Sequence, residues 1–196
     1  MAKPMSAQNI VSPSADGIAA SAKAAQKGPG LPPVHLWNPP FCGDLDMRIA
    51  RDGTWYYQGS EIRRAPLVRL FSSILRREGD RFFLVTPVEK VGITVDDAPF
   101  VATDFDCDGQ GADQVLTFHT HVGDHAVAGP DNPIRVARDP DTDEPAPYVH
   151  VRAGLEALID RKSFYRLIEL GEHRDGWFGL WSGGTFFQII PSEDLG

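Results

Sequence analysis

The residues best suited to chemistry form a short histidine-rich run, His119-Thr-His121-Val-Gly-Asp124-His125. Zinc hydrolases gather histidine and aspartate ligands around a metal ion that keeps one position open for an activated water molecule. On a strand, His119 and His121 would share one face, because side chains alternate with a period of two. The spacing differs by one residue from the HxHxDH pattern of such hydrolases, and only two further histidines follow it. Surface or half-buried histidines are the preferred interpretation, and a metal-dependent hydrolase centred on His119, His121, Asp124 and His125 is the alternative.

A second run, DFDCDGQGAD at residues 104–113, places three alternating carboxylates before a glycine. This order matches the start of a calcium-binding loop, in which oxygen ligands surround a sharp turn. The end of the run does not match, because the twelfth position of such a loop is Val115 instead of glutamate and no helical pattern flanks it. The run is interpreted as an acidic hairpin turn, and calcium binding is left open.

Motifs for nucleophilic catalysis and for phosphate binding are missing from the sequence. It contains no GxSxG, GxGxxG or GxxxxGK pattern, and Cys42 and Cys107 have no histidine near them in sequence. We therefore predict no catalytic residue and no cofactor.

Aromatic and arginine residues accumulate near the expected joints between hairpins and helices. Aromatic walls with a few fixed charges are the usual components of a recognition pocket. We therefore predict a non-catalytic module that binds a small molecule or a protein segment between two lobes. Arg64 is also expected to reach back across a hairpin toward Asp44 or Asp46. The predicted cleft residues are Trp37, Asp44, Asp46, Trp55, Tyr57 and Arg64.

Composition limits the classes of partner. The 196 residues include 27 acidic and 19 basic side chains, and the resulting net charge of −8 repels a nucleic-acid backbone. No stretch approaches the roughly 20 apolar residues that cross a bilayer, so we expect no membrane partner. The two cysteines lie far apart and form no CxxC, which favours a reducing, cytoplasmic location.

The pattern of apolar residues predicts an α+β chain. Residues 1–30 contain no aromatic side chain and are rich in Ala, Ser, Gly, Lys and Pro, so we expect a disordered tail there. An amphipathic helix is predicted over 66–78, with Pro66 in its first turn and Gly79 at its end. We divide the rest into an N-terminal α+β module, 31–96, and a C-terminal β-rich module with one helix, 97–196. Strands are expected at 46–50, 54–58, 81–86, 88–95, 100–106, 115–121, 125–128, 134–137, 148–151 and 185–190.

Part of the first module's pattern recurs in the second module at a distance of 97 residues. Ile62, Arg64, Arg69 and Leu70 recur as Ile159, Arg161, Arg166 and Leu167. Two unrelated amphipathic helices share apolar spacing, which accounts for the leucines but not for the arginines. The repeat therefore favours internal duplication of a small β-rich, roll-like module with one main helix.

Two longer runs carry a family resemblance. With WNPPFCGDLDMRI at 37–49 and DGTWYYQGSEIRR at 52–64, the sequence resembles the uncharacterised bacterial domain-of-unknown-function family 1285 from about Pro32 to near the C-terminus. The resemblance implies two small α+β roll-like modules with repeated motifs. It implies no established activity and no site residue, and only a suggested role in signal transduction.

Overall fold

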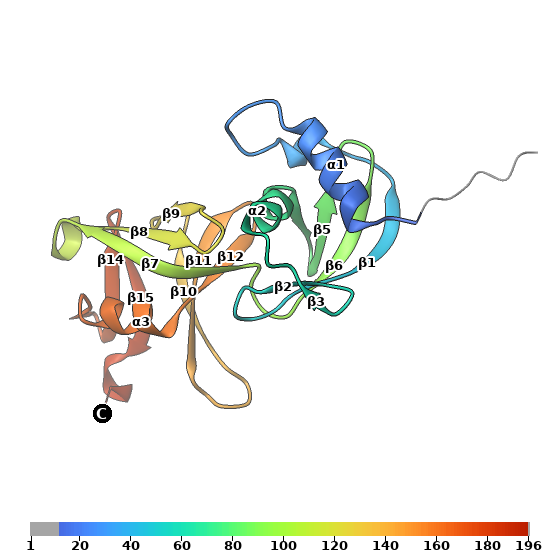
Figure 1. The fold of residues 1–196 in the computed structure, drawn as a ribbon. Coiled ribbons are helices and arrows are strands. Elements are labelled where there is room, and N and C mark those ends of the chain that lie inside the picture. The colour runs from blue at the N-terminus through green and yellow to red at the C-terminus, as the bar shows by residue number, and fades with distance from the viewer. Residues whose placement is uncertain (1–11, 196) are drawn as a thin grey trace, which may run out of the picture.

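The structure is a computed structural model that describes residues 12–195 (Figure 1). Within this range the chain forms two β-rich modules, drawn in blue to green and in lime to red. No helix in this part of the chain is long and apolar enough to cross a membrane. The helices and 3-10 helices are α1 (Ala15–Ala25), η1 (Val34–Leu36), α2 (Ala65–Ser73), η2 (Gly111–Asp113), α3 (Arg161–Ile168) and η3 (Ser192–Asp194).

The first module is a six-stranded sheet in the order β3-β2-β1-β6-β5-β4. Neighbouring strands are antiparallel except β1 and β6, which run parallel. Leu45, Met47 and Ile49 alternate along β1 and are buried, as the two-residue period of a strand requires. The strands are β1 (Phe41–Ile49), β2 (Trp55–Tyr57), β3 (Ser60–Glu61), β4 (Leu75–Glu78), β5 (Arg81–Val85) and β6 (Lys90–Val95).

The second module combines a six-stranded sheet, β10-β11-β12-β7-β8-β9, with a three-stranded sheet, β13-β14-β15. In the larger sheet only β12 and β7 are parallel. The strands are β7 (Phe100–Asp108), β8 (Val115–Thr120), β9 (His125–Val127), β10 (Ile134–Arg138), β11 (Pro145–Arg152), β12 (Leu155–Ile159), β13 (Glu172–Arg174), β14 (Trp177–Ser182) and β15 (Thr185–Pro191).

The order of elements recurs along the chain, as the sequence repeat predicts. In the first module a hairpin leads into α2 and then into β4, β5 and β6, while in the second a hairpin leads into α3 and then into β13, β14 and β15. The pairing differs, because β6 joins β1 whereas β15 stays in its own sheet with β14. The α+β fold of two modules, each with one main helix, is confirmed.

The two modules share one hydrophobic core. A single cluster of buried side chains runs from Trp55 and Phe71 in the first module to Phe100 and Phe118 in the second. All four side chains are at most 1% exposed. Their burial holds the modules together, since burying each large apolar side chain contributes about 1.5–3 kcal/mol.

The predicted disordered tail over residues 1–30 is wrong for α1. Ala15, Ile18, Ala19 and Ala22 form an apolar stripe at helical spacing and are buried in the shared core. Alanine has the highest helix propensity, and the Ser14 hydroxyl accepts the Gly17 N–H as an N-cap, so a segment without aromatic residues still folds. Residues 1–11 of that prediction lie outside the described residues.

The helix predicted over 66–78 is also too long. It is confirmed as α2 but ends at Ser73, and Leu75–Glu78 form β4. β4 pairs with β5 in the register Leu75 opposite Leu84. The apolar pair Ile74 and Leu75 fits a helix or a strand equally, and pairing with β5 decides between them.

Candidate functional site

The most suggestive cavity lies between the two modules and has a volume of about 290 Å³. The first module contributes the turn at residues 52–55 and the start of α2, including Arg69. The second module contributes His121 and Val122, from the turn between β8 and β9. Because both modules supply walls, a molecule in this interlobe pocket touches both.

Trp55 is one of the residues that line the interlobe pocket. Its ring is 1% exposed and stacks on Phe71, with 6.1 Å between the ring centroids. Its indole nitrogen, Nε1, is buried and has no hydrogen-bond partner among residues 12–195. An indole N–H only donates, and leaving such a buried donor unpaired costs about 1–3 kcal/mol. Trp55, which lines the pocket, therefore carries a donor that lacks an acceptor among the described residues.

His121 supplies a second unpaired donor. The backbone N–H of Val101 donates to its Nδ1 over 3.1 Å, so in the neutral ring Nε2 carries the proton. Burial lowers the pKa of His121, and this effect is larger than the rise caused by the backbone groups of Val101 and Gly53. The ring is therefore neutral at physiological pH. Nε2 is buried against the backbone of Gly53 and, among the described residues, makes no hydrogen bond of good geometry.

Arginine side chains line the mouth of the interlobe pocket. Arg63 forms an ion pair with Glu61 at 3.2 Å, whereas Arg69 has no ion pair with any described residue. Arg69 is exposed and its side chain approaches Gly123 of the second module. Two buried donors and one free cation thus surround the same space, an arrangement suited to an anionic oxygen.

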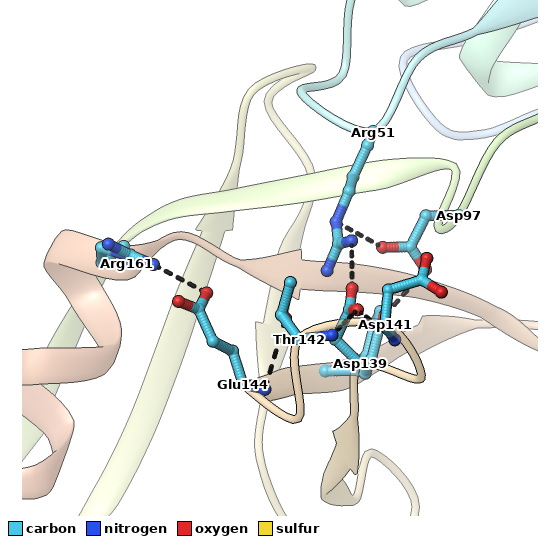
Figure 2. A network of polar contacts seen from close by, with 8 residues as sticks. Arg51, Asp97, Asp139, Asp141, Thr142, Glu144 and Arg161 are labelled. Atoms are coloured by element: carbon cyan, nitrogen blue, oxygen red, sulfur yellow. Dashed lines mark hydrogen bonds and ion pairs between the residues drawn. The ribbon is translucent and has the colours of Figure 1, made fainter.

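A polar junction behind the pocket fixes the turn that forms its wall. Arg51 lies 3.3 Å from Asp97 and donates to Asp139 over 2.9 Å, which ties the first module to the second (Figure 2). Asp139 also accepts the backbone N–H groups of Asp141 and Thr142. These hydrogen bonds lower the pKa of Asp139 to about 2, and the one from Arg51 has the largest effect.

The turn that Arg51 anchors ends in Gly53, whose φ of +87° is in the region that favours glycine. A Cβ atom there would lie 2.9 Å from His121 Nε2. This turn between β1 and β2 packs closely against His121 and Val101 of the second module.

Of the six predicted cleft residues, only Trp55 lines the interlobe pocket. Trp37 packs against the core, and its carbonyl accepts Arg76. Tyr57 is half-buried against the same core. Asp46 is exposed and lines a separate depression of about 270 Å³ beside Tyr56. The structure therefore does not gather these side chains at one point.

Arg64 does not meet Asp44 or Asp46. Asp44 forms an ion pair with Arg81 at 2.6 Å instead, across Gly92, where a side chain would collide with the Asp44 carboxylate. Arg64 occupies the N-cap position of α2, without a capping hydrogen bond from its side chain, and lines a groove beside α1. The expected contact is wrong because the parallel pairing of β1 with β6 brings β5, and not α2, to Asp44.

The four residues of the alternative metal cluster lie in three different surroundings. The Nδ1 atoms of His119 and His125 lie 2.7 Å apart, and His119 Nε2 lies 2.7 Å from Asp106. β8 ends at Thr120, so His121 leaves the strand alternation and turns into the interlobe pocket, while Asp124 pairs with Arg152 at 3.0 Å. Within residues 12–195 no three His, Cys, Asp or Glu side chains are placed to hold a metal ion, and the hydrolase alternative finds no support.

The acidic run at 104–113 forms the hairpin turn between β7 and β8. Asp104 binds Arg166 at 2.5 Å, while Asp106 meets His119. These carboxylates therefore have protein partners and do not converge on a common point.

Two stretches of the chain match the two domains of one family. Residues 32–98 match "Domain of unknown function (DUF1285), N-terminal domain", and residues 99–189 match "Protein of unknown function (DUF1285), C-terminal domain". The chain belongs to the DUF1285 family. The two DUF1285 domains meet between Ala98 and Pro99, and the interlobe pocket takes its walls from both.

Solved structures agree with this assignment. A DUF1285 family protein from Silicibacter pomeroyi DSS-3, a crystal structure at 2.50 Å, is 72% identical, with a TM-score of 0.87 over 93% of this chain and 99% of that one. A DUF1285 family protein from Shewanella baltica OS155, at 1.40 Å, is 29% identical, with a TM-score of 0.51 over 64% of this chain and 91% of that one. No curated protein matches the chain.

Proposed function

We propose that this DUF1285 protein is a non-catalytic binding module that takes a small molecule with an anionic oxygen between its two lobes. The observation that carries the proposal is the buried indole N–H of Trp55, which has no acceptor among the described residues. A carboxylate or phosphate oxygen would accept from this donor and from His121 Nε2–H at once, with Arg69 supplying the opposite charge.

A regulatory or signal-transduction role follows from the position of the pocket. A ligand held by Trp55 in one module and His121 in the other binds most tightly to a single arrangement of the two modules. Binding then shifts the population toward that arrangement, which a partner can recognise. The net charge of −8 disfavours nucleic acid as that partner. We place the module in the cytoplasm, because Cys42 and Cys107 are exposed and unpaired.

NMR spectroscopy of the indole N–H groups tests the proposal directly, because it observes the Trp55 indole N–H. Acetate and inorganic phosphate are titrated separately into labelled protein, and the Trp55 resonance is assigned by its loss in Trp55→Phe. A new hydrogen bond to an anionic oxygen should shift the Trp55 indole proton downfield in a saturable manner. Trp181, whose indole N–H already donates to Glu172 over 2.7 Å, serves as the internal control.

Sodium chloride at equal ionic strength separates specific binding from screening. If neither acetate nor phosphate moves the Trp55 resonance beyond the chloride control, water alone fills the pocket and the proposal fails. A shift of the Trp181 resonance as large as that of Trp55 would also count against it.

A further inference from the structure

A groove of about 570 Å³ separates α1 from α2 on the outside of the first module. The two helices lie next to one another in Figure 1. The side chains of Lys23 on α1 and of Arg64 and Arg69 on α2 line the groove, together with half-buried Leu67 and Leu70. Its size lies within the usual range of ligand sites, about 300–1,000 Å³.

The arginines of this groove differ from the other arginines of the protein. The chain has 14 arginines, all within residues 12–195, and 12 of them form an ion pair with Asp or Glu, so Arg64 and Arg69 are the two that do not. All 27 acidic side chains lie in the same described range. Acidic partners are therefore abundant, yet both unpaired arginines line this groove, and Arg69 also lines the interlobe pocket.

The positive charges are spread along the groove and do not converge. Arg64 is the N-cap of α2 and Arg69 lies five residues further on, which is about 7.5 Å along the helix axis. Lys23 adds a charge from the last turn of α1 on the opposite wall. A single phosphate group is too small to contact all three, whereas a row of carboxylates is not. Leu67 and Leu70 between the charges favour apolar residues between those carboxylates.

We infer that this groove is a docking surface for a short acidic segment of a partner protein, with acidic residues interspersed with apolar ones. Asp16, in the first turn of α1, is the acidic residue of the lining. The protein as a whole is acidic, so attraction is confined to within about one Debye length, roughly 10 Å, of the groove. Binding should therefore weaken as salt concentration rises.

Fluorescence anisotropy with a fluorescein-labelled peptide of alternating glutamate and leucine tests the inference. We expect saturable binding that falls about tenfold or more when Lys23→Ala and Arg64→Ala are combined. Lys162→Ala, on the exposed face of α3, is the matched control and should leave the affinity unchanged. Both groove side chains are exposed, so thermal melts should show the double variant folded.

A second peptide with glutamine in place of glutamate needs no variant protein. The inference would be overturned if the two peptides bound equally well or if neither bound saturably. It would also be overturned if Lys162→Ala lowered the affinity as much as the double variant does. Displacement of the acidic peptide by low-millimolar inorganic phosphate would identify a small-anion site and overturn it as well. Trp55→Phe should leave peptide affinity unchanged, which separates this groove from the interlobe pocket.

Discussion

The guanidinium of Arg51, on the turn between β1 and β2, donates to the Asp139 carboxylate on the loop between β10 and β11. Arg51 also pairs with Asp97, close to the point between Ala98 and Pro99 where the chain passes from one module to the other (Figure 2). Since the same turn carries Gly53 against His121, the junction positions one wall of the interlobe pocket.

Arg51→Ala should raise the pKa of Asp139 from about 2 part of the way to its ordinary 3.8, because the Asp141 and Thr142 N–H groups still stabilise the carboxylate. The folded pKa lies below the unfolded one, so the stability from ionised Asp139 is fully present above pH 3.8 and is lost as pH falls toward about 2. An NMR titration of the carboxyl carbon measures the shift. Arg138→Ala, at the end of β10, is the control, and an unchanged pKa in Arg51→Ala contradicts the assigned cause.

Gly53→Ala and Gly59→Ala separate steric contact from backbone strain. Both glycines have positive φ, +87° and +75°, but a Cβ at Gly53 meets His121 and Val101 whereas one at Gly59 meets nothing within 4 Å. We expect Gly59→Ala to cost about 1–2 kcal/mol of unfolding free energy and Gly53→Ala about 1–3 kcal/mol more. Urea denaturation of both variants measures the difference, and equal losses would show that the turn does not press on His121.

Ile18→Ala should destabilise the protein by about 2–5 kcal/mol, because the side chain is fully buried between α1 and the core. Ala24→Ser, on the exposed side of the same helix, should change stability by less than about 0.5 kcal/mol. Denaturant melts of the two variants provide the comparison. A loss below half a kcal/mol for Ile18→Ala would mean that α1 is not an integral part of the fold.

Local signals in the sequence were sufficient for most of the fold. Alternating apolar residues and turn glycines located the hairpins, and Gly183-Gly184 joins β14 to β15 with both φ values positive, as a tight hairpin turn requires. The arginines that repeat at a distance of 97 residues located α2 and α3. The apolar stripe Ala15, Ile18, Ala19 and Ala22 is also present in the sequence. Composition alone predicts disorder there, because the segment has no aromatic residue, whereas helical spacing predicts α1.

The candidate site could not be read from the sequence, because long-range packing creates it. The sequence names Trp55 as a cleft residue, but it predicts that His121 shares one strand face with His119, whereas His121 lines the same pocket as Trp55. Only the end of β8 at Thr120, and the docking of the Gly53 turn, bring His121 to Trp55. The unpaired state of Arg64 and Arg69 likewise depends on where every carboxylate lies in space.

A double-mutant cycle on Asp124 and Arg152 tests the structural role of Asp124. Both side chains are 20% exposed, and Arg152 also donates to the Ser72 carbonyl at the end of α2. We expect a coupling energy of about 1–3 kcal/mol for this partly buried pair. The exposed pair Glu144 and Arg161 is the control and should couple by less than about 1 kcal/mol. Additive losses at Asp124 and Arg152 would show that this ion pair does not stabilise the fold.

His121 should remain neutral, with its proton on Nε2, at a pH below the ordinary histidine pKa of 6.5. Burial lowers its pKa below the ordinary 6.5, and protonation of Nδ1 would also break the hydrogen bond from the Val101 N–H. The folded pKa is below the unfolded one, so this contribution to stability is present above pH 6.5 and is lost as pH falls below that value. Long-range ¹H–¹⁵N spectra distinguish the two tautomers of His121 and follow its ring through the titration. A proton on Nδ1 instead of Nε2 at neutral pH would remove one of the two donors on which the interlobe pocket depends. A pKa above 6.5 would contradict the assigned effect of burial.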